Sequence, residues 1–220
     1  MNHYVSAPLG AAPLRALLGA ALGLALILPS QAADLKVRGK LPPICAKLDI
    51  DPEGSDALQT VSLPPDHTCK PLIKNGLPLP DPTCSPGAIN PTLTLAVLKT
   101  KGFTTKCVRD QASTPHDKQQ TYTWYKIKKP ANNSGKTQTC ELDHIISLEL
   151  GGADTVDNLW PQCGPSKAAL NKRFFKQKDA VENFLNREVK AGRMDLSEAQ
   201  RGIAKDWTQF LAAARKAGVK

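Results

Sequence analysis

The sequence predicts an α+β fold, a β-hairpin followed by helices, and three observations lead to it. The stretch from Cys140 to Cys163 opens with a strand-like run, turns at Gly151-Gly152 and ends on a second apolar run. Downstream of this stretch, apolar residues recur at the spacing of a helix. Upstream, more than half of the prolines fall between Pro42 and Pro91, where neither a sustained helix nor a central strand is expected.

Residues 1–33 have the pattern of a secretory signal peptide. Arg15 precedes an apolar run, Ala16–Leu28, and small residues suitable for cleavage follow it. A membrane anchor is the alternative, but the run is shorter than the ~20 residues that a spanning helix needs. We expect cleavage near Ala32 or Ala33. The mature chain is then periplasmic or secreted, with no stable membrane association.

Six cysteines lie after the expected cleavage point. An even number in an oxidising compartment predicts three disulfides. Zinc is the alternative, but the chain has no Cys-x-x-Cys pair, which structural zinc sites commonly use. We expect neighbours in sequence to pair, so that the last pair joins the two ends of the hairpin. The expected pairs are Cys45 with Cys69, Cys84 with Cys107, and Cys140 with Cys163.

The formal net charge is +9, and it becomes +8 without Arg15, the one charged residue of the signal segment. A basic exported protein suits a polyanionic partner, because its cations attract phosphates and release their counterions. The same charge also suits an anionic cell surface or simple solubility. Charge alone therefore does not select a function.

Two segments make up the mature chain. Residues 34–110 are predicted to be an irregular, disulfide-tied segment with one short helix. Asn90-Pro91 has the cap and first-residue pattern of a helix start, which predicts a helix over Leu93–Lys99. Residues 111–220 hold the hairpin and the longer helices.

An aromatic island, Tyr122–Tyr125, lies in the polar region before the hairpin. We expect it to form a half-buried strand, although aromatic side chains can also stack on nucleic-acid bases. His116, between a proline and an aspartate, is expected in a loop.

The strongest helix signal follows the hairpin. Ser166 can cap this helix and Gly192 ends it. Its core-facing stripe consists of Leu170, Phe174, Val181 and Leu185. A second helix is predicted to start at Ser197, with Gln200 completing a capping box. It would pack through Ile203, Trp207, Phe210 and Leu211.

Asp143 and His144 carry the chemistry of the hairpin. Neighbouring strand residues point to opposite faces, so both can serve one site only where the strand ends. Histidine can take a proton from water near neutral pH, and a carboxylate offers hard oxygen to a cation such as Mg²⁺. Asn158 is uncharged and is expected to pin the loop by hydrogen bonds. A buried polar pair at the end of an ordinary hairpin is the alternative.

These residues resemble the HNH endonuclease family, the ββα-metal nucleases, in its Asp-His version. The likeness runs through Asp143-His144, Ile146, Leu148, Leu150-Gly151-Gly152 and Asn158-Leu159-Trp160-Pro161. Weaker likeness to exported proteins of this type covers residues 85–108 and 198–207. The resemblance implies a ββα-metal core within residues 111–220.

The resemblance also implies a mechanism, metal-assisted hydrolysis of a phosphodiester bond in DNA or RNA. His144 is then the general base, and Asn158 orients the loop. Asp143, together with Asn171 near the start of the helix, holds one divalent ion. Oxygen ligands favour Mg²⁺ or Mn²⁺ over Zn²⁺. Lys167 and Lys178, on the same helix as Asn171, are expected to contact the substrate.

One departure from the family pattern keeps other functions open. No histidine follows His144, although the family's helix commonly supplies His or Asn as a further metal ligand. A degenerate motif that binds nucleic acid or the cell envelope without cutting is one alternative. A purely structural exported domain is another, and it would need neither Asp143 nor His144.

Overall fold

The computed structural model describes residues 41–109 and 115–219. All of these residues belong to one compact unit, Val37–Lys220, and the expected signal peptide lies outside them. The unit is a mixed α+β fold with three two-stranded antiparallel sheets. None of the helices within the described ranges is long and apolar enough to cross a bilayer.

The centre of the fold is the hairpin of β5 (Cys140–His144) and β6 (Leu159–Cys163). Its register pairs Cys140 with Cys163 at one end and His144 with Leu159 at the other. The disulfide Cys140–Cys163 closes the first end, with 4.0 Å between the two Cα atoms. Between the strands, the chain makes two 3-10 turns, Leu148–Leu150 and Val156–Asn158.

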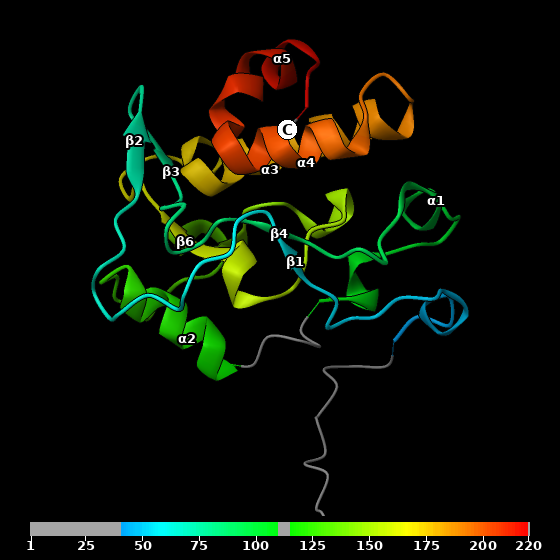
Figure 1. Cartoon of the computed structure of the whole chain (residues 1–220). Coiled ribbons are helices and arrows are strands. Elements are labelled where there is room, and N and C mark those ends of the chain that lie inside the picture. Colours follow the sequence, from blue (N-terminus) through cyan, green and yellow to red (C-terminus); the bar gives the residue numbers. More distant parts are fainter. Residues whose placement is uncertain (1–40, 110–114, 220) are drawn as a thin grey trace, which may run out of the picture. The chain divides into compact units, whose positions relative to one another are not determined.

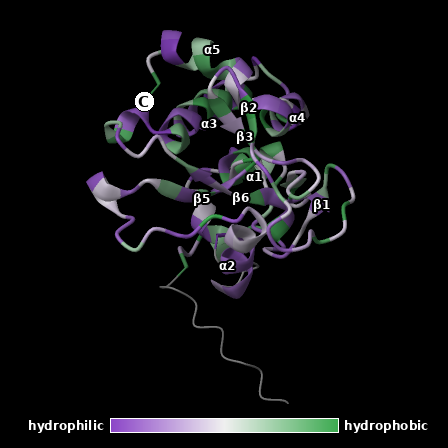
Figure 2. Cartoon of the chain, turned by 90° about the vertical axis from the view of Figure 1, so that its left-hand side faces the viewer, coloured by the Kyte–Doolittle hydropathy of each residue, from purple (hydrophilic) through white to green (hydrophobic). Residues whose placement is uncertain are grey.

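Three helices lie on one side of β6, and α2 (Pro115–Trp124) lies on the other (Figure 1). They are α3 (Phe174–Lys190), α4 (Leu196–Asp206) and α5 (Leu211–Lys216). Helix α3 carries both apolar and polar residues (Figure 2). Its apolar residues join a buried core that reaches the hairpin, with Ile145, Ile146, Trp160, Val181, Leu185, Ile203 and Trp207 among its members.

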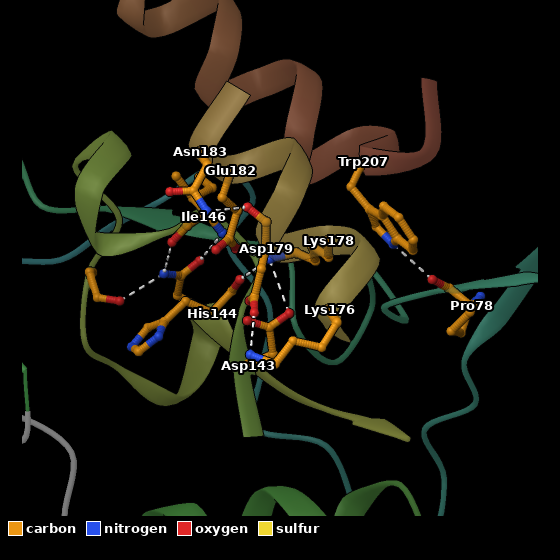
Figure 3. Close-up of polar contacts among 12 residues, drawn as sticks. Pro78, Asp143, His144, Ile146, Lys176, Lys178, Asp179, Glu182, Asn183 and Trp207 are labelled. Atoms are coloured by element: carbon orange, nitrogen blue, oxygen red, sulfur yellow. Dashed lines mark hydrogen bonds and ion pairs between the residues drawn. The ribbon is translucent and has the colours of Figure 1, made fainter. Parts of the chain in front are cut away.

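The N-terminal part wraps around this core through short elements. Strand β1 (Asp56–Ala57) pairs with β4 (Ala88–Ile89), and β2 (Leu72–Lys74) pairs with β3 (Leu77–Leu79). Helix α1 (Leu95–Leu98) follows. Long-range contacts with the helical layer hold the β2–β3 hairpin. Trp207 Nε1 donates to the carbonyl of Pro78 at 2.9 Å (Figure 3), and Lys74 pairs with Asp206.

All six cysteines form disulfides, which places the chain in an oxidising environment. The expected pair Cys140–Cys163 is present. The other two expected pairings are wrong, because Cys45 pairs with Cys107, and Cys69 pairs with Cys84. The loops fold back across the segment, so proximity in sequence does not set proximity in space.

Local signals misplace the starts of three helices. Helix α1 begins at Leu95 because Thr94 caps it, whereas Asn90 Oδ1 accepts from the backbone N–H of Thr92 and makes a turn instead. Helix α3 begins at Phe174 rather than after Ser166. Its first N–H donates to the carbonyl of Gly164 at 2.8 Å, so the chain loops before the helix starts.

Helix α4 begins at Leu196, and the capping box is absent. Gln200 Nε2 instead donates to the carbonyl of Leu150 at 2.9 Å, which ties α4 to the hairpin loop. The aromatic island is helical rather than a strand, because Tyr122 and Trp124 bury their rings from α2. His116 lies exposed in the first turn of α2 rather than in a loop.

Removing the Cys140–Cys163 disulfide should destabilise the hairpin locally. For the double variant C140A/C163A we expect the free energy of unfolding to fall by about 2–5 kcal/mol, the range found for native disulfides of small exported domains. Hydrogen exchange of the β5 and β6 amides should also accelerate. The measurements are urea unfolding and amide exchange by mass spectrometry. The matched control is C45A/C107A, and equal exchange of residues 140–163 in both double variants would contradict a local role.

Candidate functional site

The loop between β5 and β6 is pinned by Asn158, whose side chain is fully buried. Its Oδ1 accepts from the backbone N–H of Ile146 at 2.9 Å and of Ala88 at 3.3 Å. Its Nδ2 donates to the carbonyls of Ile146 at 2.9 Å and of Ala153 at 2.7 Å. The loop-pinning role expected of Asn158 agrees with these hydrogen bonds. Among the described residues, the hydrogen bonds of this side chain are all to backbone, so it acts by positioning.

Two glycines let this loop close. A Cβ atom on Gly152 would lie 1.9 Å from the carbonyl oxygen of Ile146, so no other residue fits there without a shift of the backbone. Gly151 has φ +78°, in the left-handed region that favours glycine. The backbone N–H of Asn90 donates to the carbonyl of Gly151 at 2.8 Å. The Gly151-Gly152 pair therefore allows the loop to pack on the N-terminal segment.

His144 is the last residue of β5, and a buried carboxylate orients its ring. Its Nε2 lies 2.7 Å from Oδ1 of Asp154, a residue of the pinned loop that is itself fully buried. An ionised carboxylate only accepts, so Nε2 carries the hydrogen of this bond. The lone pair of the neutral ring is then on Nδ1, to which no residue in the described ranges makes a hydrogen bond. This arrangement suits a general base.

Asp143 points to the opposite face of the hairpin, toward α3. Its Oδ2 lies 3.1 Å from the ammonium of Lys178, which is 1% exposed (Figure 3). The same ammonium donates to the carbonyl of His144 at 2.6 Å and forms an ion pair with Glu182, one helical turn further along α3. Three oxygen atoms from two strand residues and one helix residue thus surround Lys178 Nζ.

The charges of this buried group depend on one another. Burial raises the pKa of Asp143 and raises that of Glu182 to about 8, while the nearby ammonium of Lys178 acts in the opposite direction on both. Burial alone would lower the pKa of Lys178, but the carboxylates of Asp143 and Glu182 raise it above its ordinary value. On the same face, burial and the charge of Asp143 raise the pKa of Glu141 to about 7.

The expected substrate contact at Lys178 does not fit this geometry. Its ammonium is buried and engaged by Asp143, Glu182 and a backbone carbonyl, so it holds the hairpin against α3. The physical reason is the position of β5 along α3, which brings the side chain of Asp143 opposite Lys178. Lys167 lies exposed in the loop before α3, where a partner can reach it.

The place beside Asp143 where a divalent ion was expected is filled by the Lys178 ammonium. Asn171, the expected second ligand, lies exposed in a 3-10 turn before α3 rather than on the helix. In the part of the chain that the structure describes, no three His, Cys, Asp or Glu side chains are grouped so that they could hold a metal ion. The arrangement as it stands does not fit a bound metal at Asp143. Mg²⁺ or Mn²⁺ binding stays a prediction.

A cavity of about 740 Å³ borders this site on the α3 side. Glu182 and Asp179 line it from the helix, and Ser147 and Glu149 line it from the hairpin loop. The hydroxyl of Ser147 is buried, and no hydrogen bond to it is found within the described ranges. The cavity therefore has both polar and apolar walls, and it lies next to the Lys178 group.

Two residues of the site were missed from the sequence. Asp154 follows the Gly151-Gly152 turn, and an acid within a loop that must fold back on His144 was a usable signal. Glu182 lies four residues after Lys178, the spacing of an ion pair on a helix, but the burial of that pair depends on the hairpin above it.

The chain was compared with protein-family models, with curated proteins and with solved structures, and none of them matches it. The candidate function therefore rests on the residues and their geometry.

Asn158→Ala should be strongly destabilising. The substitution leaves buried backbone groups of Ile146, Ala153 and Ala88 without partners, and each unsatisfied group costs about 1–3 kcal/mol. We expect the free energy of unfolding to fall by about 3–5 kcal/mol in urea unfolding. Asn132→Ala, at an exposed position, is the control and should change it by less than about 0.5 kcal/mol. Equal stability of the two variants would contradict the pinning role.

Stability should fall as pH rises, in part through Glu182. Its pKa in the folded protein, about 8, lies above the ordinary 4.5, so folding favours the protonated form. Its contribution to stability is fully present below about pH 4.5 and is lost as pH rises through about 8. Glu182→Gln stays neutral and should flatten this part of the profile, as measured by thermal unfolding from pH 4 to 9. The exposed control Glu198→Gln should leave the slope unchanged, and an unchanged slope in Glu182→Gln would refute the assignment.

Proposed function

We propose that this protein is an exported endonuclease of the HNH type, which hydrolyses phosphodiester bonds of DNA or RNA in the periplasm or outside the cell. The observation that supports it most is the orientation of His144 by Asp154 at the end of β5. That pair leaves Nδ1 able to take a proton. The order of strand, loop, strand and helix is also the order of a ββα-metal core.

In the proposed reaction, Nδ1 of His144 takes a proton from a water molecule. The water oxygen forms a new bond to phosphorus while the bond from phosphorus to one sugar oxygen breaks. That oxygen takes a proton from solvent as it leaves, and the imidazolium of His144 returns its own proton to solvent. Asp154 holds the ring in one tautomer and stabilises the imidazolium, as carboxylates beside catalytic histidines do. The net charge of the chain favours a polyanionic substrate.

A second function follows from the Lys178 group. If the ammonium keeps its place beside Asp143, the motif would bind nucleic acid without cutting it. The fully paired, buried Lys178 is the observation that favours this alternative.

The test is cleavage of plasmid DNA and of RNA by the oxidised mature protein, with Mg²⁺, with Mn²⁺ and with EDTA. We expect His144→Ala to lower the cleavage rate by on the order of 10²–10⁴, the usual effect of losing a general base. Asp154→Asn should give a smaller loss, because the ring remains but its orientation is weakened. His116→Ala, an exposed histidine on α2, is the matched control and should cut like the wild type.

The metal series separates the alternatives. Cleavage that stops in EDTA and returns with Mg²⁺ would mean that an ion replaces Lys178 at Asp143 or binds elsewhere. Wild-type rates in His144→Ala would refute the proposed base. A wild-type protein that binds DNA at low salt but never cuts it under any metal condition would support the binding alternative.

A further inference from the structure

A second cavity, of about 540 Å³, lies where the loop before the hairpin meets the start of α3. It is lined by Lys136, Ala169, Leu170, Asn171, Arg173 and Lys176. Every charged side chain among these residues is a cation. Its volume is within the range of cavities that take small molecules. The cavity is therefore roomy and carries only positive charges, although most of its surface is apolar.

Arg173 gives this cavity a donor that lacks an acceptor. The residue is 6% exposed, and its Nε and Nη2 donate to the carbonyls of Ala168 at 3.3 Å and of Lys136 at 3.0 Å. These bonds fix the guanidinium in place. Its Nη1 is buried and makes no hydrogen bond within the described ranges. Because a buried, charged donor without an acceptor is costly, an anionic acceptor is expected at this position.

The N-terminus of α3 reinforces the charge. Arg173 is the N-cap residue, and no side chain caps the helix. Helix α3 is 17 residues long, so its first backbone N–H groups and its dipole favour an anion at this end. Lys176, in the first turn, also lines the cavity, although it pairs with Asp179 at 2.6 Å. Lys136 and Arg173 therefore supply most of the charge that an incoming ligand would meet.

We propose that this cavity binds a phosphate group of the nucleic-acid backbone. A guanidinium with fixed geometry, two ammonium groups and the positive end of the α3 dipole together suit the oxygens of a phosphate. Asn171 would add a neutral amide donor, a different role from the metal ligand expected from the sequence. That the phosphate belongs to a nucleic acid rests on the proposed function. That the cavity takes a phosphate rests on the residues of the cavity alone.

The cavity lies close to the hairpin site. Lys176 lines both this cavity and the larger one. It lies near Asp179 and Asp143 (Figure 3), and the charges of Asp179, Glu141 and Asp143 help to raise its pKa against the effect of burial. A phosphate held by Arg173 would thus hold the bound nucleic-acid strand on the side of the hairpin that Asp143 faces. Such a contact would fix the strand's register without reading its bases.

The experiment measures binding of a fluorescent single-stranded oligonucleotide to the oxidised protein by anisotropy, at several salt concentrations. All proteins carry His144→Ala so that the strand stays intact. Lys136→Gln and Arg173→Gln should each weaken binding by about 5-fold and lower the salt slope by about 0.7, the value for one phosphate contact on a single strand. Arg173→Lys keeps the charge but loses the planar guanidinium. Its affinity should lie between those of the parent and of Arg173→Gln. Lys136 is exposed, so its variant reports on binding even if Arg173 variants fold poorly.

Matched controls remove the same charges elsewhere on α3. Lys190→Gln and Arg187→Gln change exposed cations near the other end of the helix and should bind within about 2-fold of the parent. If Lys136→Gln binds like Lys190→Gln, no phosphate sits in the cavity and the inference is wrong. Equal weakening in all variants would mean that net charge alone drives binding, which also overturns it.

Two further arms separate the ligand sources and the two proposals. Competition by inorganic phosphate and by a nucleoside monophosphate reports on free phosphates. Binding of the two free phosphates that depends on Lys136, without such binding of the oligonucleotide, would mean that the cavity takes a free phosphate. The inference of a nucleic-acid backbone phosphate would then be wrong. Cleavage is measured separately, with proteins that keep His144. Binding that depends on Lys136 without any cleavage rejects the proposed nuclease but supports the phosphate site.

Discussion

The side-chain amide of Asn158 is the constraint on which the candidate site depends. It ties together the end of β5, the loop after Gly152 and the N-terminal segment at Ala88, all by hydrogen bonds to backbone. The same loop carries Asp154, and so the orientation of His144 follows from a residue that never touches its ring. A single buried amide thereby converts a flexible connection into a fixed frame for a titratable side chain.

Alternation along β5 divides the site between two faces. His144 turns toward the pinned loop, and Asp143 turns toward α3, where Lys178 meets it. The lysine joins the strands to the helix through the carboxyl groups of Asp143 and Glu182 and the carbonyl of His144. How firmly that ammonium is held therefore decides whether Asp143 could take another partner.

Patterns that a few neighbouring residues determine were predictable from the sequence, and patterns set by distant contacts were not. The hairpin, its closing disulfide, the loop-pinning asparagine and the end of α3 near Gly192 follow from local spacing and turn chemistry. The pairing of Cys45 with Cys107 and the helical state of Tyr122 depend on how remote segments pack. Lys178 is buried because β5 packs on α3 at this point, and helical periodicity alone does not predict that contact.

The attachment of the N-terminal hairpin β2–β3 has a consequence for the order of folding. Lys74 and Pro78 are held by Asp206 and Trp207, more than half the chain away, and such long-range contacts form late because a large loop must close first. The β2–β3 hairpin is thus anchored by residues that the ribosome adds much later. A nascent chain therefore cannot anchor the β2–β3 hairpin until Asp206 and Trp207 have been synthesised.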